Sequence, residues 1–215
     1  MNPILNILQL SDSMFPIGSF AHSFGLETLI SDGRVTKDNF KEYLGSMLKN
    51  QVGPCDMVFM LAANKNLNQA EELSKRYACY KVVPPFYKAS LNMGKRLLSI
   101  GEKLTGNEYL KSLNEKQILH PIAFGTVTNI LDIPASLSCD AFLYNWAASS
   151  TSAAIRLIPL GHDSAQKILH EIKETISEVY EENKDRSIED AWQFTPETEI
   201  AGLEHEKLYT KLFLS

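Results

Sequence analysis

Three side chains near the N-terminus have the chemistry of a hydrolase triad. Asp12, His22 and Ser23 bring a carboxylate, an imidazole and a hydroxyl group into one short stretch. A serine nucleophile of this kind normally sits on a strand–turn–helix elbow, and the G-x-S-x-G pattern of that elbow is absent. Because His22 and Ser23 are adjacent, a helix would also point their side chains about 100° apart. We therefore expect no catalytic residue, and a small Ser-His hydrolase is only the enzyme alternative.

Histidine and cysteine side chains are scattered along the chain. Imidazole and thiolate groups suit transition metals, but no two of the five histidines have the spacing that places two ligands on one helical face. Cys55, Cys79 and Cys139 show no C-x-x-C spacing. His22, Cys55, Cys139 or His205 could meet only through the fold. We expect no metal site, no disulfide framework and buried thiols in a reducing compartment.

Cofactor and nucleic-acid motifs are also missing. Gly18 to Gly25 lacks the G-x-x-x-x-G-K-[ST] pattern that cradles phosphates, so we expect no bound nucleotide and no cofactor. The net charge is −5, and residues 171–206 hold twelve acidic against three basic residues. Without a basic stripe, we expect no nucleic-acid partner. The acidic segment is either a solvated helix face and loop or a surface that meets a basic protein.

The elements that must position these residues are helical. Residues 141–155 carry no charge, and small residues crowd positions 147–154. This pattern predicts a buried central helix at about 135–158. A membrane span would need about 18–20 uninterrupted apolar residues, so we expect no membrane segment.

The remaining pattern predicts an all-α protein. Apolar residues recur with helical spacing, and no β-branched run has a period of two. Pro84-Pro85 should begin a helix, and Gly53-Pro54 should interrupt one. We expect one domain over residues 1–215, a helical bundle of roughly eight to ten helices. The N-terminus has no export signal, which favours a cytoplasmic protein.

Two segments at the ends of the chain are unusually apolar. The Phe-rich loop, residues 11–27, is broken by Pro16 and Gly18, so its phenylalanines either fold into the core or form a docking surface, and we favour docking. The tail, residues 205–215, would place four apolar residues on one helical face. This face should lie in a groove of the chain itself or of a partner, and we favour a partner. The four residues are Leu208, Tyr209, Leu212 and Phe213.

Four stretches together resemble the urease accessory protein UreF family. They are LSDSMFPIGSFAHSFGLE at 10–27; Ala89-Ser90 with Met93-Gly94 and Leu97-Leu98; His120-Pro121 and Phe124-Gly125 with SAAIRLIPLG at 152–161; and HEKLYTKLFLS at 205–215. Many family members have a basic residue where this chain has Leu214, although Lys211 lies close by.

The resemblance implies a helical, dimeric scaffold or chaperone that is not an enzyme. Such a protein binds UreD (UreH in some species) and the GTPase UreG, and acts through the complex on apo-urease. GTP hydrolysis is then coupled to nickel insertion, and UreG GTPase activity is possibly modulated. A helical adaptor unrelated to urease is the non-enzyme alternative, which the absence of a 33–47-residue repeat disfavours.

Candidate partner-binding residues lie in the two end segments, and the sequence does not assign UreD to one and UreG to the other. Arg156 has two interpretations: an arginine finger offered to UreG, or a structural group that meets a carboxylate or helix-end carbonyls. Its apolar surroundings favour the structural interpretation, with an ion pair as the preferred form. The candidates are Phe15, Pro16, Gly18, Phe20, His22, Ser23, Gly25 and Glu27 in the loop, and Leu208, Tyr209, Lys211, Leu212 and Phe213 in the tail.

Overall fold

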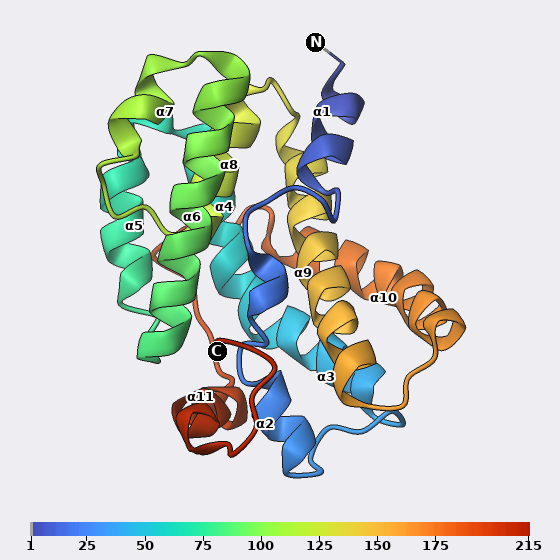
Figure 1. The fold of residues 1–215 in the computed structure, drawn as a ribbon. Coiled ribbons are helices and arrows are strands. Elements are labelled where there is room, and N and C mark those ends of the chain that lie inside the picture. The colour runs from blue at the N-terminus through green and yellow to red at the C-terminus, as the bar shows by residue number, and fades with distance from the viewer. Residues whose placement is uncertain (1) are drawn as a thin grey trace.

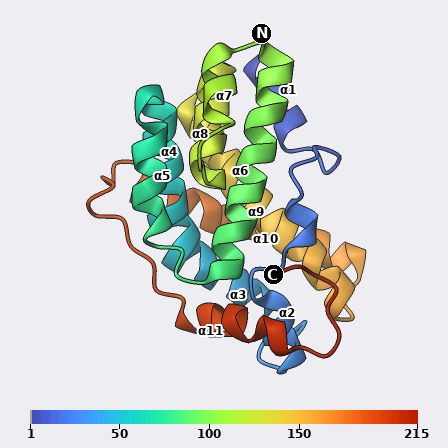
Figure 2. The ribbon, with the colours of Figure 1, turned by 60° about the vertical axis from the view of Figure 1, so that its left-hand side comes forward.

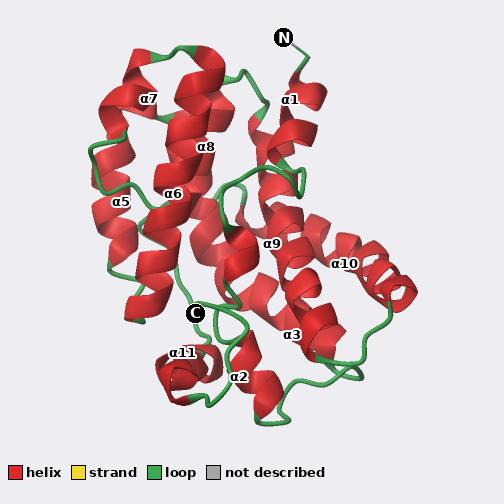
Figure 3. Cartoon of the chain, viewed as in Figure 1, coloured by secondary structure: helices red, strands yellow, loops and turns green. Residues whose placement is uncertain are grey.

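The computed structural model describes residues 2–215, and these residues form helices joined by loops, without a strand (Figure 3). The all-α prediction is confirmed. The α-helices are α1 (Pro3–Leu10), α2 (Leu26–Ser31), α3 (Phe40–Met47), α4 (Val58–Lys65), α5 (Ala70–Ala78), α6 (Pro84–Thr105), α7 (Glu108–Leu113), α8 (His120–Ile130), α9 (Ala135–Leu157), α10 (His162–Asn183) and α11 (Pro196–Glu204).

Helix α9 is the centre of the bundle, as its uncharged sequence predicts. It contacts α1, α2, α4, α8 and α10, and none of residues 141–155 is exposed (Figure 1). Tyr144, Asn145 and Trp146 are only half-buried, although Tyr144 and Trp146 pack against the core. Among residues 2–215, no helix combines the length and apolar character needed to cross a membrane.

Gly53 and Pro54 do not interrupt the helical structure, contrary to the expectation from sequence. A π-helical segment, Leu48–Met57, joins α3 to α4 and contains Pro54. Pro54 has no N–H group to donate to an earlier carbonyl of this segment. The N–H of Phe194 donates to the carbonyl of Asn50 at 2.9 Å, and the N–H of Trp192 donates to the carbonyl of Pro54 at 3.2 Å. The chain between α10 and α11 thus satisfies two acceptors of the π-helical segment.

Glycines set the closest helix contacts. A Cβ on Gly125 of α8 would lie 2.1 Å from the main-chain oxygen of Met60 in α4. A Cβ on Gly94 of α6 would lie 2.1 Å from the oxygen of Ile118, just before α8. Helices α4, α6 and α8 therefore pack with their backbones nearly in contact, and together they form one side of the core (Figure 1).

The two end segments of the chain meet. Seen from a second direction, the C-terminal segment passes beside the N-terminal loop and α2, with α11 below (Figure 2). The N–H of Leu214 donates to the carbonyl of Ala21 at 2.8 Å. The tail is not helical beyond the 3₁₀ turn His205–Lys207, so the predicted helical face does not form.

Candidate partner-binding site

The Phe-rich loop is shaped by three residues with positive φ. Gly18, Phe24 and Gly25 have φ angles of 85°, 50° and 86°. At Gly25 a Cβ would lie 2.7 Å from the main-chain oxygen of Thr198 in α11, so only glycine fits there. The loop is thereby pressed against α11 before α2 begins.

The last residue of the tail is held by the turn that these angles create. The main-chain oxygen of Ser215 accepts from the N–H groups of Ser23 and Phe24, at 2.6 and 3.0 Å, and from Ser23 Oγ at 2.8 Å. His22 Nδ1 and Ser215 Oγ are hydrogen-bonded at 2.9 Å. Burial lowers the pKa of His22, so this imidazole is neutral near pH 7.

Glu27 fixes the middle of the tail from inside the protein. Its carboxylate accepts from the N–H groups of Leu212 and Phe213 at 2.7 and 3.3 Å. Nε2 of His205 donates to the same carboxylate at 2.8 Å, and Glu27 and His205 are only 5% and 2% exposed. A buried carboxylate is stable only with several such donors, so α2 and the tail are ordered together.

Arg156 joins the central helix to both end segments. Its guanidinium donates to the carbonyl of Phe20 at 2.9 Å and lies 4.1 Å from the ring centroid of Phe213. Within residues 2–215 it forms no ion pair, and the side chain is exposed. The expected ion pair with a carboxylate is therefore wrong. The guanidinium meets a carbonyl of the 3₁₀ turn Ser19–Ala21 and an aromatic face instead.

The candidate residues divide into anchors and exposed groups. Among the exposed side chains, Phe20 is 39% exposed, Leu212 65%, and Tyr209 fully exposed. Phe213 is buried against the chain itself, so the groove for this residue is the chain's own, contrary to our preference for a partner. Phe15, Ser23, Gly25, Glu27 and Phe213 are buried, His22 and Leu208 are half-buried, and Pro16, Gly18, Phe20, Tyr209, Lys211 and Leu212 are exposed.

The chemistry proposed for a hydrolase is not assembled. Ser23 Oγ donates to Ser215 and not to an imidazole, and the Asp12 carboxylate accepts from the N–H of Met14 at 2.6 Å. Sequence reasoning missed His205 and Ser215 as anchors, because the pairing of Glu27 with His205 spans 178 residues. The only sequence signal for this pairing was the position of Glu27, an acidic residue directly after the stretch Phe24 to Leu26.

Metal ligands do not gather either. Among residues 2–215, no group of three or more His, Cys, Asp or Glu side chains could hold a metal ion. Cys55 and Cys139 are buried, and burial raises the pKa of both thiols. Cys79 is exposed, and all three are free.

Comparison with known proteins gives a consistent result over nearly the whole chain. The UreF family model matches residues 35–173. "Urease accessory protein UreF" of Trichodesmium erythraeum is 32% identical, over 97% of this chain and 95% of that protein. Proteins of the same name from Bacillus sp. (strain TB-90) and Lachnoclostridium phytofermentans are 30% and 29% identical, over 100% of this chain and 100% and 99% of theirs. The loop and the tail lie outside the family model but within the ranges these relatives share.

Proposed function

Because the chain belongs to the UreF family of urease accessory proteins, we propose that it is a non-enzymatic scaffold of urease maturation. In this role it binds UreD (UreH) and the GTPase UreG in the cytoplasm, and GTP-dependent nickel insertion into apo-urease follows from the assembled complex. The chain works by recognition, and nickel passes to urease as cargo. We further propose that the chain acts as a homodimer.

The observation that carries the proposal is the rigid display of apolar groups by the tail. Tyr209, Leu212 and Leu214 point outward, while the backbone that bears them is fixed by buried partners, Glu27 and Ser23. Aromatic and large aliphatic side chains contribute most of the binding energy in protein interfaces. A segment that is ordered before binding also loses less conformational entropy when the partner arrives.

Arg156 fits a structural role better than a catalytic one. Its guanidinium is already engaged by Phe20 and Phe213, at the junction of loop, tail and α9. An arginine finger would have to leave both contacts to reach a nucleotide on UreG. We therefore propose that Arg156 holds the two segments in the conformation that partners recognise.

Co-purification with UreD and UreG tests the proposal. We expect a tagged intact chain to retain both partners, and the double variant Tyr209→Ala/Leu212→Ala to lose at least one. Both side chains are exposed, so the thermal melting temperature of this variant should stay within about 2 °C of the wild type. Light scattering of the chain alone should give twice 24.1 kDa.

The point at which the chain is truncated matters, because the tail supplies the partners of the buried Glu27 carboxylate. Ending the chain after Glu204 removes His205 and leaves Glu27 buried without its partners, whereas ending it after Lys207 keeps the Glu27–His205 pair. The second truncation still removes the Leu212 and Phe213 donors to Glu27, so circular dichroism and thermal melting must show that it is folded before its binding is compared. A stable, folded chain ending at Lys207 that still binds UreD and UreG would contradict the role given to the tail. The same complexes, assayed for GTP turnover, report whether UreG is stimulated or restrained.

A further inference from the structure

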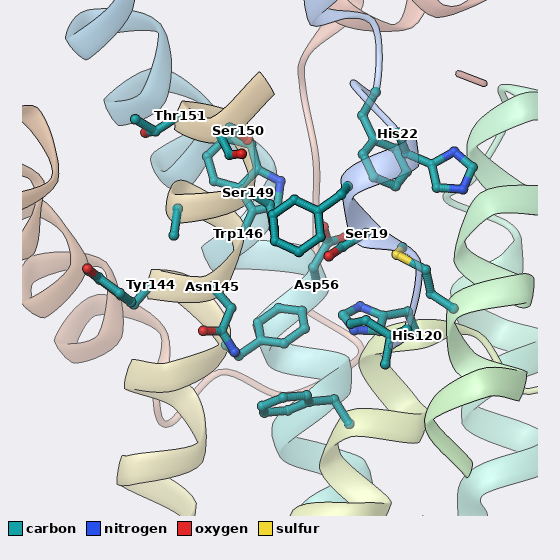
Figure 4. A pocket seen from close by; sticks show the side chains of 18 of the residues that line it. Ser19, His22, Asp56, His120, Tyr144, Asn145, Trp146, Ser149, Ser150 and Thr151 are labelled. Carbon is teal, nitrogen blue, oxygen red and sulfur yellow. The ribbon is translucent and has the colours of Figure 1, made fainter. Parts of the chain in front are cut away.

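A cavity of about 380 Å³ lies between the N-terminal loop and helices α6, α8 and α9 (Figure 4). Its volume is within the range of small-molecule sites. Most of the surface is apolar and aromatic, and the N-terminal loop and the three helices supply most of the wall. Prominent lining residues are Phe15, Phe86, Met93, Phe124, Phe142 and Trp146.

One polar group in the wall has no partner. His120 lines the cavity, with its ring centroid 5.8 Å from that of Phe142 and 6.2 Å from that of Phe124. Its Nε2 atom is buried and makes no hydrogen bond. Leaving a buried nitrogen unpaired is unfavourable, so the position favours a molecule that supplies a hydrogen-bonding group. The surrounding aromatic rings favour a flat apolar body for the rest of that molecule.

The charges inside the cavity are already balanced. Asp56 accepts from Lys81 Nζ at 2.8 Å and from the Tyr77 hydroxyl at 2.7 Å, and all three line the inner end. Asp12, the other acid in the wall, is exposed to solvent. An anionic ligand would therefore be desolvated without gaining an unpaired counter-charge. A cationic ligand could pair only with Asp12, and an ion pair at an exposed carboxylate contributes little.

We propose that this cavity binds an uncharged aromatic molecule with one hydroxyl group, which hydrogen-bonds to Nε2 of His120. A hydroxyl can donate or accept, so it satisfies this nitrogen in either tautomer of the neutral imidazole. The site is separate from the exposed side chains of the tail, and the proposal does not depend on the role in urease maturation.

Calorimetric titration of the full chain with matched probes tests the site. The probes are 2-naphthol, naphthalene, which lacks the hydroxyl, and 2-naphthoate, which is charged. We expect 2-naphthol to bind about tenfold more tightly than naphthalene, the effect of one buried hydrogen bond. 2-Naphthoate should not bind. Binding of 2-naphthol should also change the fluorescence of Trp146, which lines the cavity.

Three variants locate the binding. His120→Phe should bind both neutral probes equally, whereas His170→Phe, on the exposed side of α10, should keep the tenfold preference. Ser149→Phe places a ring in the cavity and should abolish binding, with circular dichroism confirming the helical fold. The proposal is overturned if the wild type shows no saturable binding, if it binds naphthalene as tightly as 2-naphthol, or if folded Ser149→Phe binds unchanged.

Discussion

His120 makes the stability of the protein depend on pH. Burial lowers the pKa of this imidazole from 6.5 to about 4. When pH falls below 6.5, the unfolded chain takes up a proton that the folded chain does not, so the free energy of unfolding decreases. The loss should grow to about 3 kcal/mol as pH approaches 4.

Urea unfolding of the wild type and His120→Phe, between pH 7 and pH 4, measures this contribution. We expect the stability of the wild type to fall more steeply than that of the variant, because the phenylalanine has no proton to bind. His22 also has a lowered pKa but is present in both proteins, so it cancels in the difference. Parallel pH curves for the two proteins would show that His120 does not titrate in this way.

Sequence reasoning at the level of single residues did not predict which side chains anchor the loop and the tail. Glu27 was a candidate contact residue, yet it is a buried anchor whose donors lie near the other end of the chain. Arg156 was expected to meet a carboxylate or helix-end carbonyls because its neighbours in sequence are apolar. It lies on an exposed side of the helix and contacts a carbonyl and an aromatic ring. Such pairings depend on tertiary contacts, for which local spacing carries no signal.

At the scale of elements, periodicity predicted most helices correctly. Pro84-Pro85 begins α6, and the uncharged run lies within α9, because these signals act locally. Two predictions failed where a distant segment intervened. The π-helix through Pro54 accepts a hydrogen bond from the N–H of Phe194, and Glu27 holds the tail in a non-helical conformation.

The contact of α4 with α8 depends on Gly125, and Gly125→Ala tests it. The added methyl group would meet main-chain atoms of Met60 and Asn64, which cannot move aside without shifting α4. We expect the free energy of unfolding to fall by about 3 kcal/mol.

Gly45→Ala is the matched control for this prediction. Gly45 lies in α3 with no atom near the position of its Cβ. The same substitution there should stabilise the protein by about 0.5–1 kcal/mol, because alanine has the higher helix propensity. Denaturant unfolding measures both changes, and equal effects at the two positions would show that the close helix contact has no energetic consequence.

At the scale of the whole molecule, the fold joins its two ends into one unit. The loop alone has few regular hydrogen bonds, and the tail alone has no helix to support it. Together they share the Ser215, Leu214 and Glu27 contacts, with Arg156 bridging both to α9. Because of these contacts, the conformation of the tail depends on the conformation of the loop. Helix α2 connects both segments to the core.

Glu27→Ala should release both segments at once. The variant leaves His205 and the N–H groups of Leu212 and Phe213 buried without an acceptor, and breaking a buried pair in this way costs about 3–5 kcal/mol. We expect amide hydrogen exchange at 212 and 213 to accelerate at least about a hundredfold, and exchange at 23 and 24 to accelerate with it. The amides of α4 and α8 should stay much better protected than those of the tail, because neither helix touches the carboxylate and both exchange only when the core opens. Glu42→Ala, at an exposed position of α3, should leave all of these rates unchanged. If the tail amides accelerate alone while residues 23 and 24 stay protected, the two ends are independent, and the loop owes its shape to its own residues.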